Sequence, residues 1–171
     1  MRSFPQKVMV LAAGYGKRML PITNRIPKPL VEIKGEPIIH HIIKKILKLG
    51  IQDIIINVHH LSEEVINSLK IFGPRIKIIK EKKLLETGGG VLNAIKKKKL
   101  GTNLEPFFVI NGDIFWIEKK NSSLKNLYKN WDEEKMDVLL ILKDKSSFFG
   151  YKGGGDFDFL EKKNKFGKIN N

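Results

Sequence analysis

The chain has 171 residues, of which 42% are apolar and 29% are charged, and it contains no cysteine. This composition fits a soluble globular protein with a real hydrophobic core, and it excludes disulfides, thiolate metal sites and cysteine nucleophiles. No apolar run approaches the roughly 20 residues that a membrane-spanning helix needs. We therefore expect a cytoplasmic protein that does not bind membranes.

The 32 Lys and Arg residues outnumber the 18 Asp and Glu residues, and the formal net charge is +14. One interpretation is nucleic-acid binding. The other is a lysine-rich surface, because runs such as Ile95–Leu100 and Glu161–Lys168 resemble solvated faces, and aromatic residues do not alternate with the cations as a stacking surface requires. Nucleic-acid binding is therefore the less favoured alternative. A positive field would also favour anionic small molecules.

Apolar periodicity predicts strands and helices in alternation. Continuously apolar runs predict strands at Lys7–Ala12, Asp53–Val58, Ile76–Lys80, Pro106–Ile110 and Asp137–Leu142. Helical spacing and cap signals predict helices over Glu36–Leu49, from the cap residue Ser62 to Phe72, over Thr87–Lys98, and from Ser122 or Ser123 to about Asn130. This alternation is typical of a parallel sheet with right-handed crossovers.

The chain changes character after Leu142. The alternation in "FDFL" and the turn-like "KNKFG" predict a β-hairpin near the C-terminus. The sequence contains no internal repeat and no flexible linker. We therefore expect one α/β domain over residues 1–171, with a mainly parallel sheet followed by a C-terminal β-hairpin.

Glycines and cations follow the first predicted strand. Gly14 and Gly16 permit a positive φ and let backbone N–H groups approach a ligand closely. Lys17 and Arg18 add positive charge beside those donors. Lys28 lies between two prolines, which we expect to hold its backbone extended. The pattern indicates a phosphate site, because ligands of open α/β sheets bind beyond the carboxyl ends of the strands.

Two well-known phosphate motifs do not match this loop. No Gly-Lys-Ser/Thr follows at the spacing of a P-loop, and Met19 stands where a dinucleotide fingerprint needs its third glycine. From the residues alone, a glycine turn with surface lysines explains the loop equally well. Both interpretations therefore stay open at this point.

Two more segments fall at the same edge of the predicted sheet. Gly88–Gly90 each weaken a helix by roughly 1 kcal/mol relative to alanine, so a base or sugar lying against bare backbone would explain them; the alternative is an ordinary flexible helix entry. Asp113 follows a buried strand in "VINGD". A carboxylate there can hold Mg²⁺ whose octahedron phosphate oxygens complete; the alternative is a common strand-end turn.

The four histidines lack the spacing of metal ligands. His40 and His41 lie in one predicted helix, and His59 and His60 follow a predicted strand. Neighbouring residues point in different directions on either kind of element. We therefore expect structural roles for all four side chains.

The motifs together resemble those of a known family. "LAAGYGKRM", "PKP", "INVHHL", "LLETGGG" and "VINGD" occur in the order and at the spacing of sugar-1-phosphate nucleotidyltransferases, and the resemblance extends from Lys7 to about Phe159. Within that family the sequence is most similar to the small bacterial form, which includes N-acetylmuramate-1-phosphate uridylyltransferases and mannose-1-phosphate guanylyltransferase-like relatives. The resemblance implies a Rossmann-like three-layer α/β/α fold.

The resemblance also implies substrates and residue roles. The substrates are a nucleoside triphosphate, UTP or GTP, and a sugar 1-phosphate, and the cofactor is Mg²⁺. The implied nucleotide-binding residues are Leu11, Ala13, Gly14, Gly16, Lys17, Arg18, Glu86, Thr87 and Gly88. The implied sugar-binding residues are Asn111, Gly150 and Asp156. The implied catalytic residues are Arg18, Lys28 and Asp113, and Asp113 is the metal ligand.

The sequence departs from the family pattern after the predicted hairpin. The resemblance implies a further strand, a sugar-binding segment and a second metal-binding aspartate, and these have no counterpart before Asn171. We therefore expect a nucleotidyltransferase domain that is incomplete at its C-terminus and binds Mg²⁺ more weakly. An exposed sheet edge would promote self-association. The alternative function is a nucleotide-binding remnant with little catalytic activity.

Overall fold

The computed structural model describes residues 3–101, 105–118, 121–147, 153–163 and 166–170, with the backbone alone for 158–163 and 166–170. These residues group into two compact units, Met1–Ile117 and Glu118–Asn171. Each unit is described below by itself. The single domain expected over residues 1–171 stays a prediction.

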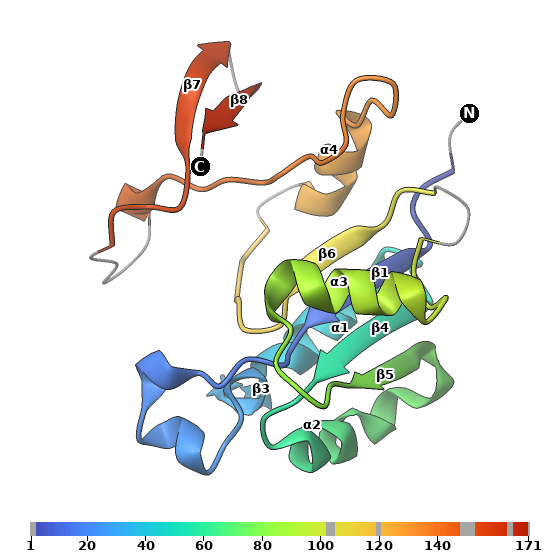
Figure 1. Ribbon diagram of the computed structural model, residues 1–171, viewed down its shortest axis with the longest axis vertical. Coiled ribbons are helices and arrows are strands. Elements are labelled where there is room, and N and C mark those ends of the chain that lie inside the picture. Colours follow the sequence, from blue (N-terminus) through green and yellow to red (C-terminus); the bar gives the residue numbers. More distant parts are fainter. Residues whose placement is uncertain (1–2, 102–104, 119–120, 148–152, 164–165, 171) are drawn as a thin grey trace. The chain divides into compact units, whose positions relative to one another are not determined.

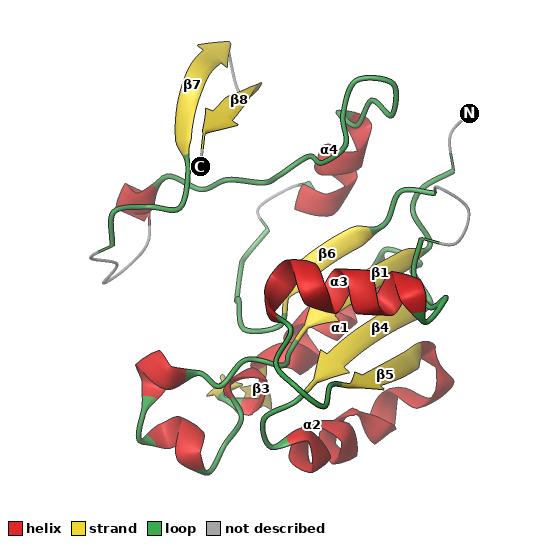
Figure 2. Cartoon of the chain, viewed as in Figure 1, coloured by secondary structure: helices red, strands yellow, loops and turns green. Residues whose placement is uncertain are grey.

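A four-stranded parallel sheet is the framework of the first unit (Figures 1 and 2). Its order is β5-β4-β1-β6, and its strands are β1 (Lys7–Leu11), β4 (Asp53–Val58), β5 (Ile76–Lys80) and β6 (Phe108–Asn111). All pairings are parallel. The four predicted strands of this unit are therefore confirmed to within two residues at each end, and so is the mainly parallel α/β class.

Helices pack on the sheet because their apolar faces match its buried strands. The helices are α1 (Ile38–Lys48), α2 (Ser62–Leu69) and α3 (Glu86–Lys96). In Figure 1, α3 lies in front of the sheet and α1 lies behind it. On the α3 side, Met9, Ile55 and Ile79 form one core cluster with Ala94 and Leu100.

Two helix starts differ from the prediction. Glu36 and Pro37 form the short strand β3 (Glu36–Pro37), which pairs antiparallel with β2 (Glu32–Ile33), so α1 begins two residues later than expected. Ser62 is wrong as the cap of α2, because Leu61 occupies that position with a left-handed φ of 46°. Ser62 is instead the first residue of the helix, and it is buried.

His40 joins α1 to α2 and the turn that follows it. Its Nε2 lies 2.7 Å from the Ser68 Oγ, and its ring meets the Phe72 ring edge-on at 5.1 Å. His41 Nε2 donates to the Ile33 carbonyl at 2.8 Å. These contacts agree with the structural roles expected for both histidines.

The second unit contains one helix and two paired strands. Helix α4 (Ser123–Lys129) begins as predicted, and the Ser122 hydroxyl accepts from the Lys125 N–H at 3.4 Å. In the predicted hairpin region, β7 (Asp158–Lys163) pairs antiparallel with β8 (Phe166–Asn170). The connection between them, residues 164–165, lies outside the described residues.

The strand predicted at Asp137–Leu142 is wrong. The structure assigns it no regular secondary structure, and Val138, Leu140 and Ile141 are exposed. A strand needs a neighbour that satisfies its backbone groups. The described strands of this unit pair only with each other, so β-propensity alone does not make this apolar run a strand. Across the described helices of both units, none has the length and apolarity needed to span a membrane.

We expect His40 to make stability depend on pH. Burial is the main cause that lowers the pKa of His40 below its ordinary value of 6.5. The unfolded chain therefore binds more protons than the folded protein as the pH falls below about 6.5. The free energy of unfolding should be highest above that pH and should decline as the pH falls toward the folded-state pKa.

The measurement is urea unfolding at several pH values between about 7 and 5, with His40→Gln as the control because glutamine keeps a polar group but does not titrate. The hydrogen bonds from Lys44 and Lys80 lower the pKa values of Glu36 and Glu63 below 4.5. The protonation of these two carboxyl groups therefore changes the free energy of unfolding only below the pH range of this experiment. Equal slopes for the wild type and the variant would contradict the assignment to His40.

Candidate functional site

The carboxyl ends of β1 and β6 lie side by side and set the position of Asp113. Leu11 and Asn111 are partners in the register. The Gly112 N–H then donates to the Leu11 carbonyl at 2.8 Å, and a Cβ at Gly112 would lie only 2.7 Å from that oxygen. Glycine is therefore required at this point. It lets the chain turn against β1 and brings Asp113 to the start of the glycine loop.

The loop after β1 is shaped by Gly16 and Thr23. Gly16 has a φ of +65°, and a Cβ there would meet the Thr23 Cγ2 at 2.8 Å. The buried Thr23 donates through its hydroxyl to the Gly16 carbonyl at 3.0 Å. Gly14 differs, because a Cβ there would meet nothing within 4 Å. The expected positive φ is therefore found at Gly16, and Gly14 leaves open space beside the backbone.

The structure brings Lys28 and Asp113 together although 85 residues separate them. The Lys28 ammonium donates to Asp113 Oδ2 at 2.6 Å, and the two side chains are 22% and 34% exposed. The buried residues Pro27 and Pro29 flank the lysine. The ion pair joins the cationic loop to the carboxylate of "NGD", and both groups keep contact with solvent.

Lys28 itself does not have the extended backbone that was expected. It begins a 3₁₀ turn over Lys28–Leu30, and the extended residues are Pro27 before the turn and Val31 after it. The Leu30 N–H donates to the Pro27 carbonyl at 2.8 Å, and the Val31 N–H donates to the Lys28 carbonyl at 3.1 Å. These two hydrogen bonds outweigh the preference for extended backbone before a proline.

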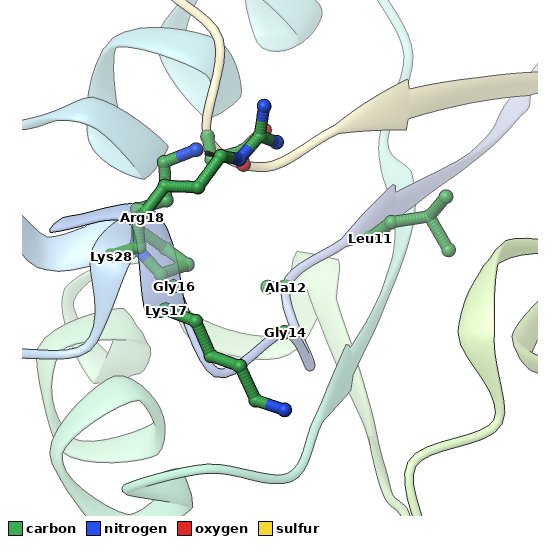
Figure 3. Close-up of a pocket in the computed structure, with 9 residues that line it drawn as sticks. Leu11, Ala12, Gly14, Gly16, Lys17, Arg18 and Lys28 are labelled. Atoms are coloured by element: carbon green, nitrogen blue, oxygen red, sulfur yellow. Dashed lines mark hydrogen bonds and ion pairs between the residues drawn. The ribbon is translucent and has the colours of Figure 1, made fainter. Parts of the chain in front are cut away.

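A pocket of about 210 Å³ lies between the loop and Asp113. It is lined by Leu11, Ala12, Gly14, Gly16, Lys17, Arg18, Lys28, Pro29 and Asp113. In Figure 3, Arg18 and Lys28 extend to the same side of the loop, and Lys17 extends to the other. Three cations against one carboxylate suit an anionic ligand.

The other predicted site residues that the structure describes do not line this pocket. Ala13 is buried, and its neighbour Ala12 lines the pocket instead. Asn111 is exposed at the end of β6, and Asp156 is exposed in the second unit. Gly150 lies outside the described residues.

The "ETGGG" segment forms the first turns of α3 rather than a loop before it. Glu86, Thr87 and Gly88 are exposed and do not line the pocket. Gly90 is buried, and a Cβ there would lie 2.9 Å from Asn57 Nδ2. Close packing, rather than a ligand, therefore explains the glycine at this position. The nucleotide contacts expected of Glu86, Thr87 and Gly88 stay a prediction.

Polar side chains that follow β4 contact the loop, and their partner Tyr15 was not singled out in the sequence. The Tyr15 hydroxyl lies 3.1 Å from His59 Nε2. The Lys17 ammonium lies 5.8 Å from the centre of the Tyr15 ring. His59 Nδ1 donates to the Glu81 carbonyl at 2.9 Å, and His60 Nε2 donates to the Thr23 carbonyl at 3.0 Å. The contacts of His59 and His60 with backbone carbonyls agree with the structural roles expected for them.

The side chains of the pocket suit a divalent cation only if a bound ligand supplies most of its oxygen ligands. Among the residues that the structure describes, no three His, Asp or Glu side chains gather to hold a metal. Asp113 is the carboxylate of the pocket, and one of its oxygens accepts from Lys28. Mg²⁺ is commonly bound through one or two carboxylates together with substrate phosphates. The site therefore fits Mg²⁺ held by Asp113 and by phosphate oxygens.

The molecule is thus an α/β protein in which a cationic glycine loop and a strand-end aspartate meet at the carboxyl edge of a parallel sheet, the edge where such sheets bind ligands. Residues 7–155 match the family model described as "Nucleotidyl transferase". The chain belongs to the nucleotidyl transferase family.

Curated relatives agree with this assignment. The chain is 36% identical over 162 residues to N-acetylmuramate alpha-1-phosphate uridylyltransferase of Caulobacter vibrioides, covering 91% of this chain and 65% of the relative. It is 36% identical over 112 residues to the mannose-1-phosphate guanylyltransferase catalytic subunit beta of Danio rerio, covering 63% of this chain and 31% of the relative. The chain thus spans less than two thirds of the length of these relatives.

Solved structures share the fold. HddC from Yersinia pseudotuberculosis complexed with GMP-PN aligns with a TM-score of 0.54 at 32% identity, over 63% of this chain and 48% of that one. A UDP-glucose pyrophosphorylase complexed with UDP-glucose aligns with a TM-score of 0.57 at 26% identity, over 74% of this chain and 54% of that one.

The two glycines of the loop should respond differently to alanine. Gly16→Ala should lower the free energy of unfolding by about 1–2 kcal/mol, because a left-handed backbone and the contact with Thr23 oppose the new Cβ. Gly14→Ala should change it by less than about 0.5 kcal/mol, because its Cβ meets nothing. Urea unfolding of both variants measures the difference; equal losses would contradict this description of the loop.

Proposed function

We propose that the protein transfers a nucleoside monophosphate unit from a nucleoside triphosphate to a sugar 1-phosphate and releases pyrophosphate. The observation that carries the proposal is the Lys28–Asp113 pair inside a pocket that the glycine loop also lines. Cations beside a bare backbone suit a triphosphate, and the carboxylate suits its divalent cation. Family membership supports the same reaction class.

The chemistry needs little from the protein beyond binding and charge. A phosphate oxygen of the sugar 1-phosphate attacks the α-phosphorus, the bond from that phosphorus to the β-bridging oxygen breaks, and pyrophosphate leaves with the electron pair. The nucleophile is already anionic, so no general base is required. Catalysis then consists of orienting two anions and neutralising the charge that develops between them.

The chain's residues divide this work among them. Gly14 and Gly16 let the loop backbone approach the triphosphate, and Lys17 and Arg18 neutralise it. Lys28 lines the pocket from a 3₁₀ turn, and we propose that its ammonium contacts the reacting phosphates. When bound, Mg²⁺ would be held by Asp113 and would supply further positive charge.

The substrates follow from the relatives only as a proposal. One relative, which matches 91% of this chain, is an N-acetylmuramate alpha-1-phosphate uridylyltransferase, and others are mannose-1-phosphate guanylyltransferases. UTP or GTP with a sugar 1-phosphate is therefore the proposed pair. The combination to test first is UTP with N-acetylmuramate 1-phosphate, whose reaction would make a precursor for the cell wall. Glu86, Thr87 and Gly88 are proposed to contact the base and ribose, and Asn111 and Asp156 the sugar.

The test is pyrophosphate release. The protein is incubated with Mg²⁺, each nucleoside triphosphate and a panel of sugar 1-phosphates, and we expect release with at least one pair that includes UTP or GTP. Release with no pair from a folded sample would contradict the enzyme assignment. Calorimetric binding of nucleotide without release would favour the binding remnant.

Asp113→Asn should reduce activity far more than stability. We expect the rate to fall by about 100-fold or more, because the variant removes the carboxylate charge from the cation site. The free energy of unfolding should fall by less than about 1 kcal/mol, because the ion pair with Lys28 is partly exposed. Initial rates and urea unfolding measure the two effects. Parallel losses in both would identify Asp113 as a structural residue instead.

Arg18→Ala should weaken triphosphate binding by about tenfold, because a charge-assisted hydrogen bond is worth about 1.5 kcal/mol. Arg18 is exposed at the pocket and should contribute little to the fold. Titration calorimetry with UTP and GTP gives the dissociation constants. Exposed Arg75, on the turn before β5, offers a control substitution of the same type outside the pocket. An unchanged dissociation constant for Arg18→Ala would remove its phosphate role.

A further inference from the structure

Asn57 bridges the ends of neighbouring strands from inside the fold. It lies in β4 opposite Leu11 of β1 and Ile79 of β5, and its side chain is 2% exposed. Its Oδ1 accepts from the Ala12 N–H at 3.0 Å. Ala12 is the residue with which the chain leaves β1 and enters the glycine loop, so Asn57 holds the root of that loop.

Glu81 continues the bridge toward α3. It follows β5 directly and is 4% exposed. Its Oε1 accepts from Asn57 Nδ2 at 2.9 Å, and its Oε2 accepts from the Leu85 N–H at 3.2 Å. Leu85 is the residue that precedes α3. One chain of three hydrogen bonds therefore runs from the loop root through two buried side chains to the start of α3.

Helix α3 packs directly on this bridge. A Cβ at Gly90 would lie 2.9 Å from Asn57 Nδ2 and 3.3 Å from Glu81 Oε1. The helix can come this close only because Gly90 has no side chain. The Asn57–Glu81 pair, the loop root and the first turns of α3 thus form one packed group.

A buried polar pair needs a reason, because it costs free energy unless each group is satisfied. An apolar pair could fill the same space without that requirement. Hydrogen bonds differ from apolar contacts because they fix direction as well as distance. The bridge therefore sets the orientation of two backbone segments relative to each other, and these are the two segments proposed to contact the two ends of a nucleotide.

We propose that Asn57 and Glu81 are positioning residues that hold the loop between Ala12 and Lys28 and the N-terminus of α3 in the arrangement that binds the nucleotide. The inference rests on the proposed function, because the loop is taken to hold the triphosphate and α3 to meet the base and ribose. Neither side chain lines the pocket. Both act through the backbone at Ala12 and Leu85.

The order of donors and acceptors allows a reversal test. In Glu81→Gln, one oxygen must serve both Asn57 and Leu85, and the new amide nitrogen faces a donor. In Asn57→Asp, two carboxylates face each other at the 2.9 Å contact. In the double variant N57D/E81Q, the new carboxylate at position 57 accepts from the Ala12 N–H and from the new amide at position 81. The oxygen of that amide accepts from the Leu85 N–H, so all three hydrogen bonds are restored with the middle one reversed.

The main readout is the dissociation constant of UTP and of GTP, each with Mg²⁺, measured by calorimetry where all variants are folded. We expect each single variant to weaken binding by about tenfold or more, as when a hydrogen-bonded supporting residue is lost. The double variant should return to within about threefold of the wild type. Ile46→Val, in the core of α1, is the matched control: it should lower the melting temperature without changing the dissociation constant.

The second readout is hydrogen exchange of the loop amides without nucleotide. We expect faster exchange in both single variants and recovery in the double variant. Single variants that lose melting temperature but keep the wild-type dissociation constant, or a double variant as weak as the singles, would overturn the inference while leaving the proposed function intact. If the wild type neither binds nucleotide nor releases pyrophosphate, the proposed function is refuted. In that case hydrogen exchange still tests the positioning role of Asn57 and Glu81, and unchanged exchange of the loop amides in the single variants would overturn it.

Discussion

The parallel pairing of β1 on both of its edges is the constraint on which the rest of the structure depends. It places the end of β1 beside Asn57 of β4 and beside Asn111 of β6. Every segment that leaves these strands at their carboxyl ends therefore starts from the same small area. The chain runs outward from β1 through β4 to β5 and then returns to β6 on the other side of β1. The loop of β1 consequently lies at the point where the winding reverses, which is where open α/β sheets bind ligands.

The Lys28–Asp113 ion pair contributes little to the stability of the fold, and a ligand can therefore replace either partner at little cost. Partly exposed ion pairs contribute about 1 kcal/mol or less, so the fold does not depend on this contact. Each partner keeps the other in place at hydrogen-bonding distance. A phosphate can replace the carboxylate at the ammonium, and a cation can replace the ammonium at the carboxylate, with little loss of folding free energy. A strongly buried pair would resist that exchange, because separating it leaves uncompensated charge.

The sequence predicts well what depends on local composition. Strands β4 and β5 have the predicted ends because β-branched residues fill them and turn residues or charges follow. The loop residues around Gly16 and Lys28 were identified because residue type alone reports charge and backbone freedom. The strand expected at Asp137–Leu142 failed because β-propensity does not supply a pairing partner. Ser62 failed as a cap because Leu61 takes the left-handed position, and cap geometry depends on how the preceding strand ends.

Buried polar contacts between segments that are distant in the chain could not be predicted from the sequence. Asn57 in "IINV" and Glu81 in "IKEKK" look like a strand polar residue and one more surface charge. Their connection depends on the register that puts β4 beside β5 and on α3 lying across both. The same holds for the ion pair that closes the pocket: its two residues were predicted separately, but their 2.6 Å contact follows from the sheet order.

The glycines of the site fall into two groups: those that the fold itself requires and those for which packing gives no reason. Gly16 is fixed by its positive φ, Gly112 by the Leu11 carbonyl, and Gly90 by the Asn57 amide. The fold by itself requires glycine at these three positions. At Gly14 and Gly88 an added Cβ would meet nothing within 4 Å, so packing supplies no reason for their missing side chains. Gly14 lines the pocket and Gly88 lies in the first turn of α3. Close approach of a nucleotide to bare backbone would account for both, and it would do so at the two segments that the Asn57–Glu81 bridge connects.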